Sequence, residues 1–286
     1  MPWNYLAASQ WKNIGVIQIC EYTGVYGVSF LIVMINVSVG LALRSMFLPS
    51  KERRYRRPYP AMFACALLLL SMTFGAVLLK QRRAEFRDSI PFRAGIVQPN
   101  LSQRRNASAE KALEALEVCA GLSKSLFLEG KEKPDVVIWP ETAVPYSYNA
   151  MSEFSSRYRM EVLSMLLKYQ VPFVLGTIFL EQNAVDPAKV DIYNSALLLK
   201  PGRGIAGRYS KEHIVPVGEY VPYSETFPWL AKAAGMGRNL TRGKQFNSLE
   251  LAPDVRAGVS ICYEDVYAYV SRDQARNGAN VLLVVT

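Results

Sequence analysis

The stretch Pro-Asp-Val-Val-Ile-Trp-Pro-Glu-Thr-Ala-Val-Pro-Tyr occupies residues 134–146 and decides the fold class. Its first part, 134–139, is a continuous apolar run that Pro140 ends, and this pattern is typical of a strand buried on both faces. Similar runs predict further strands at residues 92–98, 172–178, 194–199, 256–262 and 280–285. Residues 107–129 and 151–169 carry the apolar period of helices. Strands that alternate with helices predict an α/β domain.

Glu141 stands two residues beyond the end of this run, directly after Pro140. A carboxylate at that place leaves a buried strand and enters a turn that proline stiffens. Taken alone, it is equally well explained as a solvated loop residue. It becomes a hypothesis for a general base because two further reactive residues stand in similar surroundings.

Those two residues are Lys211 and Cys262. Lys211 precedes the stretch Ile-Val-Pro-Val-Gly-Glu-Tyr-Val-Pro at 214–222, which is unusually constrained for a surface loop. Cys262 follows the apolar run Ala-Gly-Val-Ser-Ile at 257–261 and precedes polar residues. Strand ends that open into polar residues are where sites of α/β proteins lie. The structural alternatives are a surface lysine and a buried, inert cysteine.

A carboxylate, an ammonium and a thiol can together perform acyl transfer. Ordinary pKa values of about 4.3 for Glu and 8.5 for Cys make direct proton transfer unfavourable by roughly 6 kcal/mol. Burial of the carboxyl group and a cation beside the thiol would narrow that gap. Lys211 is expected to supply the cation and, with the backbone N–H of Tyr263, to stabilise a developing oxyanion. Glu219 is expected to orient Lys211.

Two apolar segments near the N-terminus indicate where this chemistry takes place. Residues 22–43 and 58–79 contain no charged side chain. As helices, each would span roughly 30 Å, the thickness of the hydrocarbon core of a bilayer. Buried core helices are the alternative, but they seldom run this long without a charge. We expect a membrane region over residues 1–83 and a catalytic domain over 84–286.

Much of the positive charge lies between these segments. Residues 44–57 hold six Lys or Arg and one Glu, a net +5 of the +9 of the whole chain. A nucleic-acid-binding protein would spread basic side chains over a folded face, so we expect no nucleic-acid partner. Under the positive-inside rule the basic loop is cytoplasmic. The catalytic domain is then expected on the opposite side of the membrane.

The number and spacing of the cysteine and histidine residues exclude several kinds of metal site. The spacings of Cys20, Cys65, Cys119 and Cys262 match no zinc motif. A single histidine, His213, excludes a multi-histidine metal site. We expect neither a metal nor another cofactor, and we expect His213 to be structural. A Cys119–Cys262 disulfide in an oxidising compartment is the alternative to a free thiol.

Three separate motifs carry a resemblance to a known family. Trp-Pro-Glu-Thr at 139–142, Tyr-x-Lys-x-His-x-Val-Pro-x-Gly-Glu-Tyr-Val-Pro at 209–222 and Cys-Tyr-Glu at 262–264 resemble the nitrilase superfamily. Residues 21–44 resemble a transmembrane segment of its membrane-bound branch, the apolipoprotein N-acyltransferases. The similarity runs from about residue 14 to the last residue.

The resemblance implies an αββα sandwich on the periplasmic side of a multi-pass bacterial inner-membrane protein. It implies that Glu141 is the general base, Lys211 the transition-state stabiliser and Cys262 the nucleophile. The implied supporting residues are Glu219, Tyr263 and Glu264. The implied reaction moves an acyl chain from a membrane phospholipid to a cysteine thioester. The α-amine of the S-diacylglyceryl-cysteine of an apolipoprotein then receives it. The membrane, the phospholipid and the apolipoprotein are the implied partners.

The sequence departs from the family pattern at both ends. The family has several more N-terminal spans, and this chain ends at Thr286 directly after an apolar strand. We therefore expect a sandwich that is truncated at its C-terminus. Two other functions stay open, a membrane-tethered carbon-nitrogen hydrolase in which water replaces the amine, and an inactive fragment.

Residues 222–242 form a loop that Gly and Pro interrupt and that carries large apolar side chains. These side chains are Phe227, Trp229, Leu230 and Met236. We expect them to cover lipid tails as a lid. Ordinary packing on the domain is the alternative.

Overall fold

The computed structural model divides the chain into two units, Met1–Pro91 and Phe92–Thr286. It describes residues 5–47, 59–87, 89, 91–101, 108–224, 226–233, 239–244 and 247–286. Residues 48–57 of the expected basic loop lie outside the described residues, as do Pro58 and the expected lid residue Met236.

The first unit is helical. The short helices η1 (Leu6–Gln10) and α1 (Ile14–Ile17) precede two long ones, α2 (Cys20–Phe47) and α3 (Tyr59–Arg87). Within them, Cys20–Arg44 and Tyr59–Arg87 are long and apolar enough to cross a membrane. Only 17% and 22% of their most apolar windows are buried, whereas a helix that is hydrophobic all round in a soluble protein is buried in its core. The alternative of buried core helices therefore does not fit this unit.

Glycines set the packing inside the helical unit. Gly75 of α3 lies so close to α1 that a Cβ atom there would be 1.8 Å from the carbonyl oxygen of Gly15. Gly24 interrupts α2 with a φ of 60°, in the left-handed region that glycine adopts at little cost. Arg82 of α3 forms an ion pair with Glu21 of α2 at 2.9 Å. α3 continues to Arg87, past the expected boundary at residue 83.

The second unit contains two sheets. The larger has the strand order β1-β2-β3-β4-β5 and the smaller the order β6-β7-β8. The strands are β1 (Ala94–Ile96), β2 (Val136–Ile138), β3 (Phe173–Gln182), β4 (Val190–Lys200), β5 (Gly204–Ser210), β6 (Leu249–Ala252), β7 (Val255–Ile261) and β8 (Val281–Val285). Parallel pairs join β1 to β2, β2 to β3 and β7 to β8, and the other neighbours are antiparallel.

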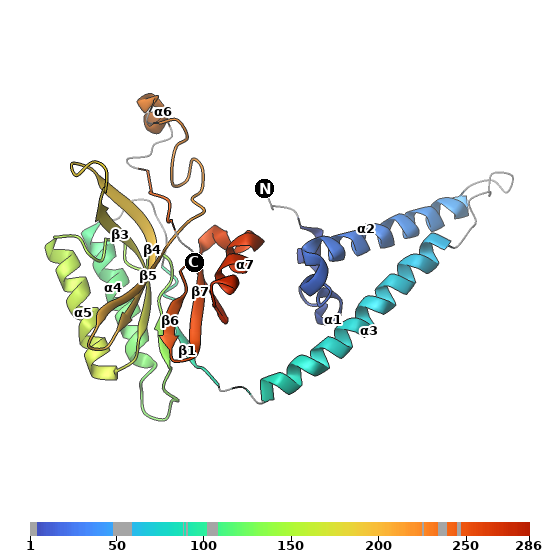
Figure 1. Cartoon of the computed structure of the whole chain (residues 1–286), viewed down its shortest axis with the longest axis horizontal. Coiled ribbons are helices and arrows are strands. Elements are labelled where there is room, and N and C mark those ends of the chain that lie inside the picture. Colours follow the sequence, from blue (N-terminus) through green and yellow to red (C-terminus); the bar gives the residue numbers. More distant parts are fainter. Residues whose placement is uncertain are drawn as a thin grey trace. The chain divides into compact units, whose positions relative to one another are not determined.

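Helices cover the outer faces of both sheets. Figure 1 shows α4 (Ala109–Ser125) and α5 (Glu153–Tyr169) beside the larger sheet and α7 (Ala268–Arg276) beside β7. Ser108 and Ser152 begin the first two helices by accepting hydrogen bonds from backbone N–H groups, the usual arrangement at a helix N-cap. The layers therefore follow the order helix, sheet, sheet, helix, and the expected αββα sandwich is confirmed.

Alternation along β4 explains why its sequence is apolar throughout. Leu197 and Leu199 belong to the core between the larger sheet and its helices. Ala196 and Leu198 belong to the core between the two sheets. Successive side chains of a strand point to opposite faces, so a sheet buried on both faces needs apolar residues at every position. The same reasoning accounts for the apolar run that forms β2.

The predicted strands and the two predicted helices of this unit are confirmed, with shorter ends in several cases. The strand predicted at 92–98 is limited to Ala94–Ile96, and the helix predicted at 107–129 ends at Ser125. Sequence reasoning missed β5, β6 and α7, as well as the short helices α6 (Pro228–Ala233) and η3 (Cys262–Val266).

Candidate active site

Glu141 lies in a turn that the end of β2 holds in place. Trp139 is fully buried, and its indole Nε1 donates to Ser123 Oγ at 2.8 Å. Gly176 of β3 lies against the turn, and a Cβ atom there would be 2.1 Å from the carbonyl oxygen of Pro140 and 2.7 Å from Glu141 Cα. Only glycine therefore permits this close approach, which brings the Glu141 carboxylate over the sheet.

Lys211 follows the last residue of β5, and its side chain is 1% exposed. Its Nζ lies 2.7 Å from Glu219 Oε1 and 3.9 Å from Glu141 Oε1. Glu219 is itself held by the backbone N–H of Val215, which donates to Oε2 at 2.8 Å. One buried ammonium therefore stands between two carboxylates, and a buried charge requires such partners.

Asn194 of β4 is a site residue that sequence reasoning missed. Its Nδ2 donates to Glu141 Oε1 at 2.6 Å and lies 3.5 Å from Glu219 Oε1. Its carbonyl oxygen accepts the backbone N–H of Lys211 at 2.8 Å. The signal was present in the sequence, because asparagine is disfavoured in strands and here directly precedes a run of mostly apolar residues.

Cys262 follows β7 and begins η3. Its φ of 52° lies in the left-handed region, which costs a residue other than glycine roughly 1–2 kcal/mol. Burial raises the pKa of the thiol, the negative charge of Glu141 and a hydrogen bond with it raise it further, and the Lys211 ammonium opposes the rise. The resting group is therefore the thiol, in contact with one carboxylate and within the field of one ammonium.

The structure thus brings together the three residues on which the sequence hypothesis depends. Cys119 and Cys262 are both free, so the alternative of a disulfide between them was wrong. Within the described residues no group of three or more His, Cys, Asp or Glu side chains is arranged to hold a metal ion. The arrangement can take a proton from sulfur and stabilise negative charge beside it.

Glu264 connects the cysteine turn to the lysine loop. Its buried carboxylate accepts hydrogen bonds from the backbone N–H groups of Glu212, His213 and Ile261 at 2.7, 2.8 and 2.8 Å. Tyr209 Oη lies 3.0 Å from both of its oxygens. Burial raises the pKa of Glu264, while these hydrogen bonds oppose the rise. Glu264 therefore stabilises the relative placement of the two loops.

The matches to known proteins follow the two units. The family model described as "Carbon-nitrogen hydrolase" matches residues 93–286. The chain belongs to the carbon-nitrogen hydrolase family. The model described as "Apolipoprotein N-acyltransferase N-terminal domain" matches residues 1–38. The family assignment covers the whole of the second unit except its first residue.

Two relatives of this carbon-nitrogen hydrolase family member are named for the same activity. An "Apolipoprotein N-acyltransferase" of Geobacter metallireducens is 29% identical over 286 residues, which are 100% of this chain and 52% of the relative. One of Chlorobaculum tepidum is 29% identical and is covered over 55% of its length. The chain therefore spans about half the length of these relatives. Among solved structures, a carbon-nitrogen hydrolase from Helicobacter pylori matches 68% of this chain and 60% of its own, with 20% identity and a TM-score of 0.47.

His213 and Tyr263 follow the lysine and the cysteine in sequence, and both pack against aromatic rings. The ring of His213 packs at a tilt of 35° against Tyr267, with centroids 3.7 Å apart, and its Nδ1 lies 2.8 Å from Tyr269 Oη. Burial, Arg242 and Lys211 lower the pKa of His213. These contacts agree with the expected structural role. Tyr263 packs edge-on against Tyr267 at 5.8 Å.

Of the predicted lid residues, the structure describes Phe227, Trp229 and Leu230. Trp229 is 65% and Phe227 50% exposed, and Leu230 is partly buried. Half or more of Phe227 and of Trp229 is therefore exposed, and their role as a lid stays a prediction. Asn239 holds the base of this loop, since its Oδ1 accepts the backbone N–H of Val221 at 3.0 Å and its Nδ2 donates to Ser224 Oγ at 2.8 Å.

A cavity of about 710 Å³ opens beside Glu141. Its walls come from the ends of β1, β2 and β8 and from α4, and they include Val97, Trp139, Pro145 and Val285. The charged residues Lys111 and Glu114 of α4 also line it. A cavity of this size and mixed lining is typical of a site for a small molecule or part of a larger one.

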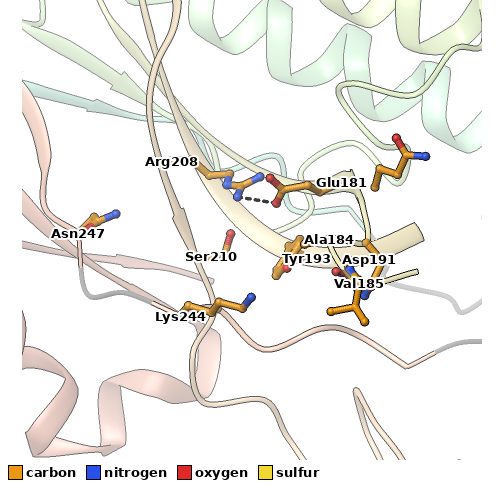
Figure 2. A pocket seen from close by; sticks show the side chains of 12 residues that line it. Glu181, Ala184, Val185, Asp191, Tyr193, Arg208, Ser210, Lys244 and Asn247 are labelled. Atoms are coloured by element: carbon orange, nitrogen blue, oxygen red, sulfur yellow. Dashed lines mark hydrogen bonds and ion pairs between the residues drawn. The ribbon is translucent and has the colours of Figure 1, made fainter. Parts of the chain in front are cut away.

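A second, smaller cavity of about 340 Å³ lies on the other face of β4 and β5. Tyr193 and Ser210 line it, and alternation places them on the face opposite Asn194 and Lys211. Figure 2 shows Glu181 and Arg208 directed toward one another there, and their ion pair measures 2.8 Å. Asp191 and Lys244 also line this cavity, so acidic and basic side chains are both present in the lining.

Proposed function

We propose that this chain carries the catalytic part of an apolipoprotein N-acyltransferase, with Glu141 as general base, Lys211 as oxyanion stabiliser and Cys262 as nucleophile. The observation that supports this most is the meeting of a thiol, a carboxylate and a buried ammonium in a chain whose first 38 residues match the N-terminal domain of that enzyme class. Soluble amidases would have no need of the two apolar helices.

In the proposed first half-reaction, Glu141 takes the proton of the Cys262 thiol and the sulfur attacks an ester carbonyl of a phospholipid. The Lys211 ammonium and the backbone N–H of Tyr263 stabilise the oxyanion of the tetrahedral intermediate. Collapse breaks the ester C–O bond, and the protonated Glu141 returns its proton to the leaving lysophospholipid oxygen. The products are an acyl thioester on Cys262 and a lysophospholipid.

In the proposed second half-reaction, the α-amine of an S-diacylglyceryl-cysteine attacks the thioester carbonyl. Glu141 accepts the amine proton and delivers it to the departing sulfur, so the thiol is restored and an amide bond has formed. The role of Lys211 is the same as in the first half, because the charge develops on the same carbonyl oxygen.

Location and lipid access complete the proposal. The two apolar helices cross a bacterial inner membrane, the basic loop between them is cytoplasmic, and the catalytic domain faces the periplasm.

The proposed lid over the lipid tails consists of Phe227, Trp229, Leu230 and Met236. Replacing Trp229 and Leu230 by serine should then lower the use of lipid substrate more than it lowers the melting temperature, with Met151→Ser as a control at a fully exposed position outside the loop.

Mass spectrometry of the protein in detergent tests the main proposal. Incubation with phospholipid should add one acyl mass to the peptide that contains Cys262, and the C262A variant should show none. A diacylated lipopeptide should then remove the adduct and gain an N-acyl group. Release of free fatty acid in place of the acylated lipopeptide would favour the membrane-tethered hydrolase, since water would then be the acceptor. No adduct at all would refute both.

A further inference from the structure

Asn194 contacts both carboxylates of the site and the backbone of the lysine. Its amide nitrogen lies 2.6 Å from Glu141 Oε1 and 3.5 Å from Glu219 Oε1, and its backbone carbonyl holds the N–H of Lys211. The residue is 3% exposed. An uncharged side chain therefore stands at the point where two carboxylates approach one ammonium.

The orientation of the Asn194 amide is determined by those carboxylates. A flipped amide would direct its oxygen at Glu141 and Glu219, and acceptor would then face acceptor. In the observed orientation Oδ1 is buried and has no hydrogen-bond partner in the described part of the chain. An unpaired buried acceptor costs about 1–3 kcal/mol. A purely structural asparagine would avoid that cost, so the orientation points to a role at the carboxylates.

Asn194 also competes with Lys211 for the same oxygen. The amide donates to Oε1 of Glu141, and that oxygen lies 3.9 Å from Lys211 Nζ, whereas Glu219 lies at 2.7 Å. Lys211 therefore has its close ion pair with Glu219 and only a longer contact with Glu141. The contacts of Asn194 and of Lys211 with Glu141 are both made to Oε1, and neither is made to Oε2.

We propose that Asn194 is a positioning residue that holds Glu141 away from Lys211 and directed at the Cys262 thiol. This inference rests on the proposed role of Glu141 as base. Without the amide, Glu141 moves onto the ammonium, where a full ion pair makes a carboxylate a weaker base. The charged and titratable groups that face Glu141 are Lys211, Glu219 and Cys262, with Lys111 and Glu114 across the cavity.

The rate at which iodoacetamide alkylates Cys262, followed by peptide mass spectrometry from pH 5 to 10, tests this role without any substrate. In the unaltered chain in detergent, Glu141 should sustain alkylation well below the pKa of the thiol. Asn194→Ala should lower the rate about tenfold near pH 7, a modest share of what a general base contributes, and should match the unaltered chain at pH 10. Asn194→Asp adds a third carboxylate, so the acid limb should move to higher pH.

Two further variants make the result decisive. Asn149 is a structural asparagine that exchanges hydrogen bonds of 2.6 and 2.9 Å with the backbone of Leu180, so Asn149→Ala should leave the pH profile unchanged. Glu141→Gln removes the base itself, so it should lower the rate near pH 7 by more than Asn194→Ala does. An Asn194→Ala rate that equals the unaltered rate at every pH, or is lowered equally at every pH, would overturn the inference. An unchanged Glu141→Gln profile would overturn the base role too. Absence of acyl transfer alongside the expected profiles would refute the proposed substrates only.

Discussion

The carboxylate of Glu264 accepts the backbone N–H of His213 at 2.8 Å, and through this bond the turn after β7 is tied to the loop that carries Lys211. The neighbouring N–H groups of Glu212 and Ile261 bind the same side chain. A buried carboxylate outside the proposed catalytic three therefore ties together the segments that carry the ammonium and the thiol.

Glu264→Gln tests this connection. The new NH2 group would face N–H donors, so at least one hydrogen bond to a charged acceptor is lost, and the free energy of unfolding should fall by about 2 kcal/mol. Alkylation of Cys262 at neutral pH should also slow. Asp265→Asn, at the exposed next residue, should change neither. A variant with unchanged melting temperature and unchanged thiol reactivity would show that the connection is unimportant.

Lys211→Met removes the cation that, among the described residues, lowers the pKa of the Cys262 thiol. The pKa should therefore rise, and the rate of thioester formation should fall by about a hundredfold or more, as for other oxyanion-stabilising groups. Mass spectrometry of the acyl adduct in reactions quenched at successive times measures the rate of thioester formation. The pH dependence of Cys262 alkylation measures the pKa of the thiol. Lys189→Met, at an exposed lysine that pairs with Asp186, is the control. A thiol pKa that stays constant would contradict the proposed electrostatic role.

Gly176→Ala tests the approach of β3 to the turn that bears Glu141. Its Cβ would lie 2.1 Å from the oxygen of Pro140, so the turn must shift, and such overpacking costs about 1–3 kcal/mol. Acyl transfer should decrease with stability. Gly121 lies on α4 with open space around its Cβ position, and Gly121→Ala should instead stabilise the chain by up to about 1 kcal/mol. Equal melting temperatures for the two variants would refute the close-approach argument.

The stability of the domain should depend on His213 in mildly acid solution. Burial and two cations lower the pKa of His213 below its ordinary value of 6.5. The folded state therefore resists protonation, and the stability that neutral His213 provides is present above pH 6.5 and is lost as the pH falls below that value. The unaltered chain should lose more in melting temperature between pH 7.5 and 5 than His213→Phe, which retains a ring against Tyr267. Parallel losses would contradict the prediction.

Apolar runs and reactive residues were sufficient to predict much of the second unit. Val136–Ile138 form a strand within the apolar run at 134–139, because the sheet is buried on both faces and needs apolar side chains at each position. A local pattern reveals that requirement. β5 escaped notice because Gly204, Gly207 and Arg208 interrupt its apolar pattern. β5 forms because it pairs with β4, and a strand that depends on a partner elsewhere in the chain leaves no local signal in its own sequence.

The grouping of Glu141, Lys211 and Cys262 followed from the motifs, whereas the contacts that hold them did not. Asn194 acts through a carboxylate 53 residues away, and no spacing rule predicts such a pair. The left-handed backbone of Cys262 was likewise hidden, since cysteine has no preference for that region. Roles that depend on tertiary neighbours become visible only once the sheets are assembled.

The backbone at position 262 has an evolutionary consequence. Serine or alanine there would bear the same steric penalty as cysteine while losing the sulfur, and glycine would relieve it. A descendant released from its chemical task but still selected for thermal robustness should therefore drift toward glycine at this position. Under the proposed nucleophile role of Cys262, glycine at this position would then mark members of the lineage that have lost acyl transfer.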